Sequence, residues 1–143
     1  MLRKASLALA LLAAVTTAAG AAADKDENAR PSKAGAGNYV HVVIFTLKKD
    51  APASAVEEVI ADCHKLLAKI KSVRSVKAGR PATEAEEKWV KKDYHVGLLV
   101  IVDDHAGLKA YLEDPLHVAF VKKHGKHFDM DKLAIFDFHN QKK

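Results

Sequence analysis

Apolar residues follow strand and helix periodicities in alternating segments of the chain. Residues 39–47 (YVHVVIFTL) are almost all β-branched, aromatic or aliphatic, which predicts a strand buried on both faces. Residues 73–79 predict a second, more exposed strand, and residues 93–102 predict a third strand that is again apolar on both faces. Residues 133–138 (LAIFDF) predict the last strand, and residues 80–92 form a charged connection.

Helices are predicted between the strands. An apolar stripe at three- and four-residue spacing predicts a helix over residues 52–71, with Pro52 in its first turn and Ser54 and Glu57 matching a capping box. Asp103 or Asp104 is expected to cap a short helix through residue 112. Asp114 and Pro115 suit the N-cap and first residue of another helix.

The order strand, helix, strand, strand, helix, strand is typical of an α+β, ferredoxin-like fold. It places the helices on one face of a four-stranded antiparallel sheet, with the first and third strands, which we expect to be parallel to each other, at the centre. Because both central strands are apolar on both faces, the face without helices needs a cover. A second copy of the same chain is the simplest cover, which predicts a homodimer closed into an α/β barrel.

The chain begins with features of an export signal. Arg3 and Lys4 precede a short apolar run over residues 7–15, and small residues at 21–23 suit a cleavage site. We therefore expect residues 1–23 to be a signal peptide, residues 24–38 a flexible linker and residues 39–139 the domain. The expected location is periplasmic or extracellular, without stable membrane insertion after cleavage, because the run is short for a bilayer span. The alternative is an uncleaved N-terminal anchor.

Charge and cysteine content exclude some functions. The formal net charge is +5 for the whole chain and +3 without Arg3 and Lys4, and the lysines are scattered, so no nucleic-acid partner is expected. Cys63 is the single cysteine and lies on the predicted apolar stripe. It is interpreted as a buried thiol, with a disulfide across a dimer as the alternative.

With these residues placed, the chain resembles the stress-responsive A/B barrel (Dabb, dimeric α+β barrel) family. The resemblance rests on the opening VHVVIFTLK, on residues 111–120 (YLEDPLHVAF) and on the closing IFDF. It implies a ferredoxin-like unit in a dimeric barrel, mostly in stress-associated proteins without an assigned reaction. One branch is the plant olivetolic acid cyclase, whose catalytic histidine and tyrosine match His117 and Tyr111 and whose strand histidines match His41 and His95. That cyclase has a histidine where this chain has Asp114.

The same residues suggest a reaction without a metal or other cofactor. His117 in the first turn of a helix stays neutral, since a helix N-terminus disfavours a cation, and it borders an apolar stripe that includes Phe120. A neutral histidine beside an apolar cavity suits removal of a proton next to a carbonyl, with Tyr111 donating to the oxygen that gains charge. His41 and His95 are expected to face the same cavity. The alternative is that each histidine is a core residue with a local partner.

Three functions follow from this reading. The first is an exported stress-response domain that binds a small apolar or carbonyl-containing ligand. The second is a cofactor-independent lyase or polyketide-cyclase-like enzyme with His117 as base, and the third is a cofactor-independent monooxygenase of the dimeric barrel type.

Several further residues carry weaker expectations. The pair of His124 and His127 is separated by Gly125, where the helix is expected to end, so no metal site is predicted. Asp137 in the last strand is interpreted as making an edge or structural hydrogen bond, with pairing to a cavity group as the alternative. Trp89 in the charged connection suits either a dimer contact or a flap over a cavity.

Overall fold

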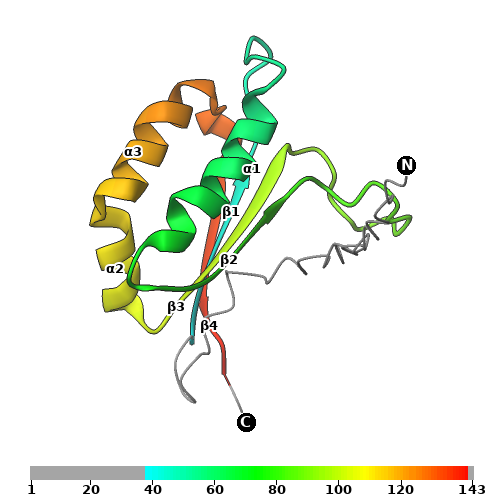
Figure 1. The fold of residues 1–143 in the computed structure, drawn as a ribbon. Coiled ribbons are helices and arrows are strands. Elements are labelled where there is room, and N and C mark those ends of the chain that lie inside the picture. The colour runs from blue at the N-terminus through cyan, green and yellow to red at the C-terminus, as the bar shows by residue number, and fades with distance from the viewer. Residues whose placement is uncertain (1–37, 142–143) are drawn as a thin grey trace, which may run out of the picture.

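The computed structural model describes residues 38–141, and the predicted signal peptide and nearly all of the predicted linker lie outside them. Four strands form one sheet in the order β2-β3-β1-β4. Their bounds are Tyr39–Phe45 (β1), Val73–Gly79 (β2), Val96–Val102 (β3) and Ala134–His139 (β4). The predicted antiparallel sheet is confirmed, with helices on one side of it (Figure 1).

The two central strands, β1 and β3, are antiparallel, so the expectation of parallel central strands is wrong. The chain passes from β1 through a helix to β2, which therefore runs in the direction of β1. The hairpin into β3 then reverses that direction. Tyr39 of β1 consequently lies opposite Val102, at the far end of β3.

Within the described part of the chain, three α-helices cover the sheet: Ala55–Lys65 (α1), His105–Glu113 (α2) and Pro115–His124 (α3). Asp104 caps α2 by accepting a hydrogen bond from Gly107 N–H at 2.8 Å. Asp114 caps α3 by accepting one from Leu116 N–H at 2.8 Å, and Pro115 is its first residue, as predicted. Single turns of 3₁₀ helix follow at Leu67–Lys69 (η1), Gly125–His127 (η2) and Met130–Lys132 (η3).

Helix α1 is shorter than the predicted helix and lacks the expected capping box. Ser54 precedes the helix in helical rather than extended conformation, and its hydroxyl donates to the Glu58 carboxylate at 2.8 Å instead of capping a backbone group. Glu57 pairs with the Arg80 guanidinium. Both residues of the predicted box therefore have other partners, and the helix begins at Ala55.

The core lies between the sheet and the helices. Alternate residues of β1 and β3, such as Val43 and Val100, are buried there together with the apolar stripe of α1. Cys63 belongs to this core, so its interpretation as a buried thiol is confirmed.

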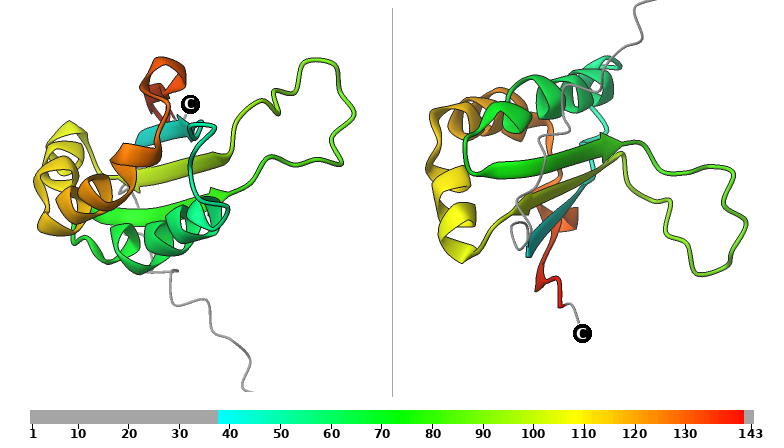
Figure 2. Two further views of the ribbon diagram at one scale, coloured as in Figure 1. Left: turned by 90° about the horizontal axis from the view of Figure 1, so that it is seen from above. Right: turned by 60° about the horizontal axis from the view of Figure 1, so that its bottom comes forward.

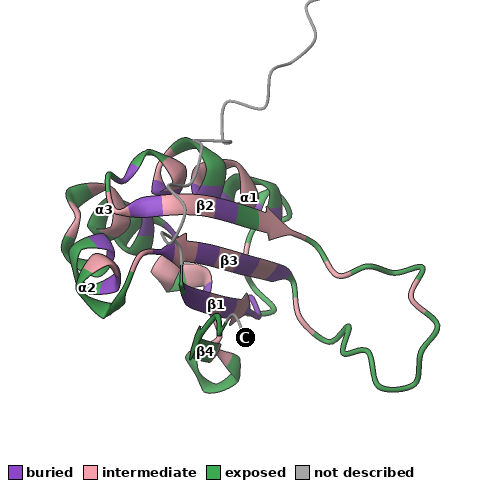
Figure 3. Ribbon diagram, turned by 90° about the horizontal axis from the view of Figure 1, so that it is seen from below, coloured by how far each residue is buried: buried purple, intermediate pink, exposed green. Residues whose placement is uncertain are grey.

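No helix among residues 38–141 lies over the opposite side of the sheet, here called the uncovered face. This face carries the other alternate residues of the strands, including Val42, Ile44, Leu99 and Ile101, which are partly exposed. Phe136 and Phe138 of β4 lie opposite Val42 and Val40 and are 57% and 51% exposed. Strand β4 is accordingly the exposed strand in Figure 3, whereas the central strands are largely buried.

Residues 80–95 connect β2 to β3 as a long loop, here called the β2–β3 arm. The arm stands clear of the rest of the domain and extends on the side of the sheet away from the helices (Figures 1 and 2). At its base Tyr94 packs over Gly97 beside Ile44. The strand predicted from residue 93 begins at Val96.

Candidate functional site

A pocket of about 200 Å³ lies between the sheet and α3 and is here called the helix-side pocket. Its wall is mainly apolar, with Val43 and Phe45 from β1 and Phe120 from α3. Three polar side chains line it as well, His41, Tyr111 and His117. The pocket thus brings together four of the five residues that the sequence suggested for a site.

His117 lies in the first turn of α3 and is half-buried. Its Nδ1–H donates to the carbonyl oxygen of Leu112 at 3.0 Å, which fixes the proton of the neutral ring on Nδ1 and leaves Nε2 as the basic nitrogen. Burial lowers the pKa of His117 below that of an ordinary histidine, and the charge of His41 adds to this effect. The Leu112 carbonyl and Asp114 act in the opposite direction without cancelling it. His117 is therefore neutral at pH 7.

His41 is held by a carboxylate from the neighbouring strand. It lies directly opposite Asp137 in the β1–β4 register, so both side chains point to the helix side of the sheet. His41 Nδ1–H donates to Asp137 Oδ1 at 2.6 Å. The imidazole is buried while the carboxylate is partly exposed. This bond orients the ring and again leaves Nε2 for another partner.

Asp137 contributes to the site more directly than the sequence indicated. Its carboxylate pairs with His41, which lines the pocket, so the structure agrees with the alternative of a cavity partner rather than with the preferred edge or structural hydrogen bond. The available signal was an acid in an otherwise apolar closing strand. The register with His41, which only the assembled sheet defines, shows its partner.

Tyr111 and Phe120 fix the other walls of the pocket. Tyr111 is 1% exposed, and its ring centroid lies 4.7 Å from that of His117 and 6.0 Å from that of His41. Burial raises the pKa of Tyr111 far above its usual value, with a smaller contribution from Cys63, so the phenol stays protonated and can donate. Phe120 packs near Phe45 and Phe128 and closes the apolar side.

His95 does not line the helix-side pocket, contrary to expectation. It precedes β3 and is exposed, and its Nδ1 accepts a hydrogen bond from Leu47 N–H at 3.0 Å. The backbone N–H of His95 donates to the Phe45 carbonyl oxygen at 2.9 Å. Because β1 and β3 are antiparallel, His95 lies at the end of the sheet opposite His41. It joins the two strand ends and has local backbone partners, as the alternative expects, but it is exposed rather than a core residue.

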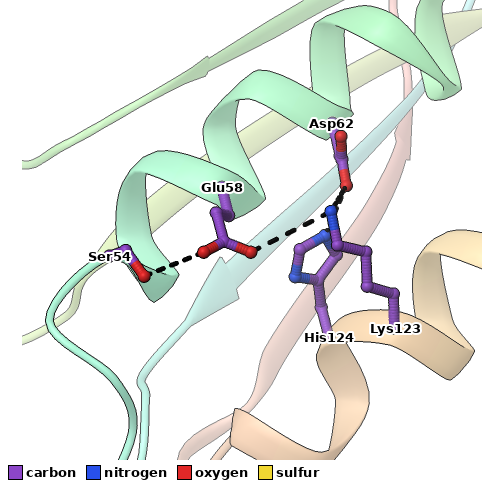
Figure 4. A network of polar contacts seen from close by, with 5 residues as sticks. All are labelled: Ser54, Glu58, Asp62, Lys123 and His124. Carbon is purple, nitrogen blue, oxygen red and sulfur yellow. Dashed lines mark hydrogen bonds and ion pairs between the residues drawn. The ribbon is translucent and has the colours of Figure 1, made fainter.

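A second polar cluster lies between α1 and α3, away from the helix-side pocket (Figure 4). His124 is 1% exposed and its Nε2–H donates to Asp62 Oδ2 at 2.8 Å. Lys123 donates to the same oxygen at 2.7 Å and lies 3.9 Å from Glu58. Asp62 thus joins the end of α3 to the middle of α1. The neighbouring His127 takes no part in this bond.

Residues 38–141 contain neither a cluster of metal-ligand side chains nor a membrane-spanning helix. No group of three or more histidine, cysteine, aspartate or glutamate side chains there is arranged to hold a metal ion. No helix within the same residues has the length and apolar character needed to cross a membrane.

Comparison with protein families identifies the domain. The model of the stress responsive A/B barrel domain (Dabb) matches residues 40–140. The chain belongs to this family. No curated protein sequence matches the chain significantly.

Solved structures similar to this Dabb chain share its ferredoxin-like fold. A Dabb family protein from Mesorhizobium loti has a TM-score of 0.59 and 27% identity, over 74% of this chain and 99% of its own. A dimeric ferredoxin-like protein of unknown function from Thermobifida fusca has a TM-score of 0.62 and 21% identity, over 78% and 97%. A hydroxynitrile lyase from Passiflora edulis has a TM-score of 0.62 and 15% identity, over 75% and 96%.

Proposed function

We propose that this Dabb protein binds a small, partly apolar carbonyl compound in the helix-side pocket and transfers a proton to and from it, as a lyase or cyclase does. The observation that carries the proposal is the state of His117. Its ring lines the pocket, is neutral, and has its Nδ1 proton fixed on the Leu112 carbonyl. Such a histidine presents a lone pair on Nε2 to a substrate.

The proposed step is removal of a proton from the carbon next to a carbonyl. The C–H bond breaks, the proton goes to His117 Nε2, and the electron pair moves onto the carbonyl oxygen. Tyr111, whose phenol keeps its proton, donates to that oxygen. Return of the proton from His117 to the product completes the cycle, so no net redox change occurs. His41, oriented by Asp137, positions the substrate.

The size and rim of the pocket define the ligand class. A volume of about 200 Å³ holds only a small molecule. Exposed apolar side chains surround the pocket: Leu112, Val121, Met130 and Ile135. These observations support an apolar compound with one polar group rather than a sugar or a phosphate.

The test uses a small ketone, 2-hexanone, in D₂O, with deuterium uptake next to the carbonyl followed by NMR. We expect uptake above the uncatalysed rate, and about a 100-fold or greater loss of the enhancement in H117Q. H105Q is the matched control, because His105 is an exposed histidine of α2 that does not line the pocket. Equal uptake by wild type and H117Q would disprove the role of His117.

A hydroxynitrile serves as a second probe, since one protein of similar fold is a hydroxynitrile lyase. Mass spectrometry of small molecules that co-purify with the protein would identify a natural ligand. If neither probe reacts but a ligand co-purifies with the protein, the proposed ligand binding is supported and the proposed proton transfer is contradicted.

We further propose that the protein is a homodimer that closes a barrel through the uncovered face. Partly exposed Val42, Ile44, Leu99 and Ile101, with the exposed Phe136 and Phe138, form a continuous apolar surface of the kind that interfaces cover. Similar structures described as dimeric support this arrangement.

Export to the periplasm or the outside of the cell also remains a proposal. It rests on the basic start, short apolar run and small residues at the N-terminus of the sequence. N-terminal sequencing of the protein recovered from outside the cytoplasm should begin at residue 24.

A further inference from the structure

The β2–β3 arm presents the single tryptophan of the chain to solvent. Trp89 is 83% exposed and the adjacent Val90 is 41% exposed. An exposed tryptophan carries a large apolar surface, and tryptophan is enriched at sites where proteins associate. The arm therefore displays an apolar contact that the rest of its own domain does not cover.

The arm is internally braced rather than loosely extended. The ammonium of Lys92, on the returning limb, donates to the carbonyl oxygens of Thr83, at 3.3 Å, and Ala85 on the outgoing limb. Val90 N–H donates to the Glu87 carbonyl at 3.0 Å and closes a turn next to Trp89. Lys88 lies over the indole ring, 5.0 Å from its centroid. These contacts hold the tryptophan at the outer part of the arm.

The base of the arm is continuous with the uncovered face. Tyr94 packs over Gly97 and beside Ile44, both of which belong to that face. The arm leaves the sheet on the side away from the helices (Figure 1). A molecule seated on the uncovered face would consequently lie next to the arm as well.

We propose that the arm clasps the second copy of the chain, so that Trp89 and Val90 pack against the partner beside the sheet-to-sheet contact. This inference rests on the proposed homodimer and extends it. Two symmetric arms, one from each copy, add a contact outside the barrel. Trp89 is then an anchor of the dimer and not a flap over the helix-side pocket, which it does not line.

The experiment uses the fluorescence of Trp89, which reports on this residue alone. Emission and acrylamide quenching are measured across a dilution series, while light scattering gives the oligomeric state of the same samples. L99D, which places a charge on the uncovered face, supplies a monomeric reference that retains Trp89. We expect the dimer to emit at shorter wavelength and to be quenched several-fold less than the L99D monomer.

Substitution provides an independent readout. W89A should raise the dimer dissociation constant by about tenfold or more, as expected for loss of a tryptophan anchor. V118A is the matched control, because Val118 is an exposed apolar residue of α3 outside both the arm and the uncovered face, and it should leave the constant unchanged.

The outcomes separate this inference from the dimer itself. A dimer in which Trp89 is quenched as readily as in the monomer, or in which W89A dimerises normally, overturns the clasp and leaves the homodimer. A wild-type monomer at every concentration overturns the homodimer together with the clasp. A further sample contains anionic lipid vesicles. If the emission of Trp89 shifts only in that sample, without change of oligomeric state, then Trp89 and its flanking lysines contact a membrane surface and the clasp is overturned.

Discussion

At the scale of the residue, the chemistry of the site depends on how each histidine is bonded. His117, His41 and His124 each have one ring nitrogen held by another group: a backbone carbonyl for His117 and a carboxylate for the other two. The Leu112 carbonyl fixes the proton of His117 on Nδ1, and burial favours the neutral form of this ring. His117 is accordingly the histidine best suited to act as a base at neutral pH.

The lowered pKa of His117 predicts the pH dependence of deuterium uptake. Burial favours the neutral imidazole, so the pKa lies below that of an ordinary histidine, about 6.5. Uptake should remain at its plateau near pH 7 and fall as the pH drops through this lowered pKa, where the base becomes protonated. NMR titration of the His117 ring should give the same midpoint. A midpoint above that of an ordinary histidine would contradict the assignment.

At the scale of the element, helix α3 is fixed at both ends. Asp114 caps its beginning, next to His117, and Asp62 of α1 holds His124 and Lys123 at its end. His117 and His124 lie about two turns apart on the same helix. The contacts with α1 thus help to set the position of α3, and with it the position of the proposed base.

Removal of Asp62 should destabilise the fold. D62A leaves the buried His124 without its acceptor and should lower the free energy of unfolding by about 1–3 kcal/mol in urea denaturation at pH 7. E113A, which removes the exposed Lys109–Glu113 pair, is the control and should cost less than about 0.5 kcal/mol. Equal effects of the two substitutions would show that the Asp62 contacts contribute no more than a surface pair.

The same carboxylate makes stability depend on acid pH. Burial alone would raise the pKa of Asp62, but the hydrogen bonds from Lys123 and His124 outweigh it and the net shift is downward. A carboxyl with a lowered pKa in the folded state stabilises the fold above its ordinary pKa, and this contribution disappears as the pH falls through the lowered value. The stability difference between wild type and D62A should therefore shrink below about pH 4.

At the scale of the whole molecule, the sheet separates two environments. The helix side contains the core and the helix-side pocket, whereas the opposite side leaves an apolar surface open. This division explains how the central strands can be apolar on both faces in a domain with helices on only one. The proposed dimer places the second face in contact with its own copy.

A charge on the uncovered face should dissociate the dimer. In a dimer of L99D, the introduced carboxylate of each copy would be buried at the interface without a partner. We therefore expect a monomer by light scattering at micromolar concentration. V118D introduces the same charge on the exposed surface of α3 and should remain dimeric. A dimeric L99D would place the interface elsewhere.

The local periodicity of the sequence was sufficient to predict the strands, the fold class and the start of α3. These features depend on alternation of apolar residues and on backbone capping by Asp114, which neighbouring residues determine. The resemblance of residues 111–120 to the Dabb family also indicated Tyr111 and His117, and the structure places both beside one pocket.

Contacts between distant segments were decided only by the tertiary structure. The antiparallel register of β1 and β3 sends His95 to the opposite end of the sheet from His41, and the β1–β4 register supplies Asp137 as the partner of His41. The predicted capping box does not form, because Ser54 donates to Glu58 and Glu57 pairs with Arg80 from a distant part of the chain. A side chain bonds to the partner that packing brings within reach. The pattern of residues along the chain does not give the distance between segments that are far apart in the sequence.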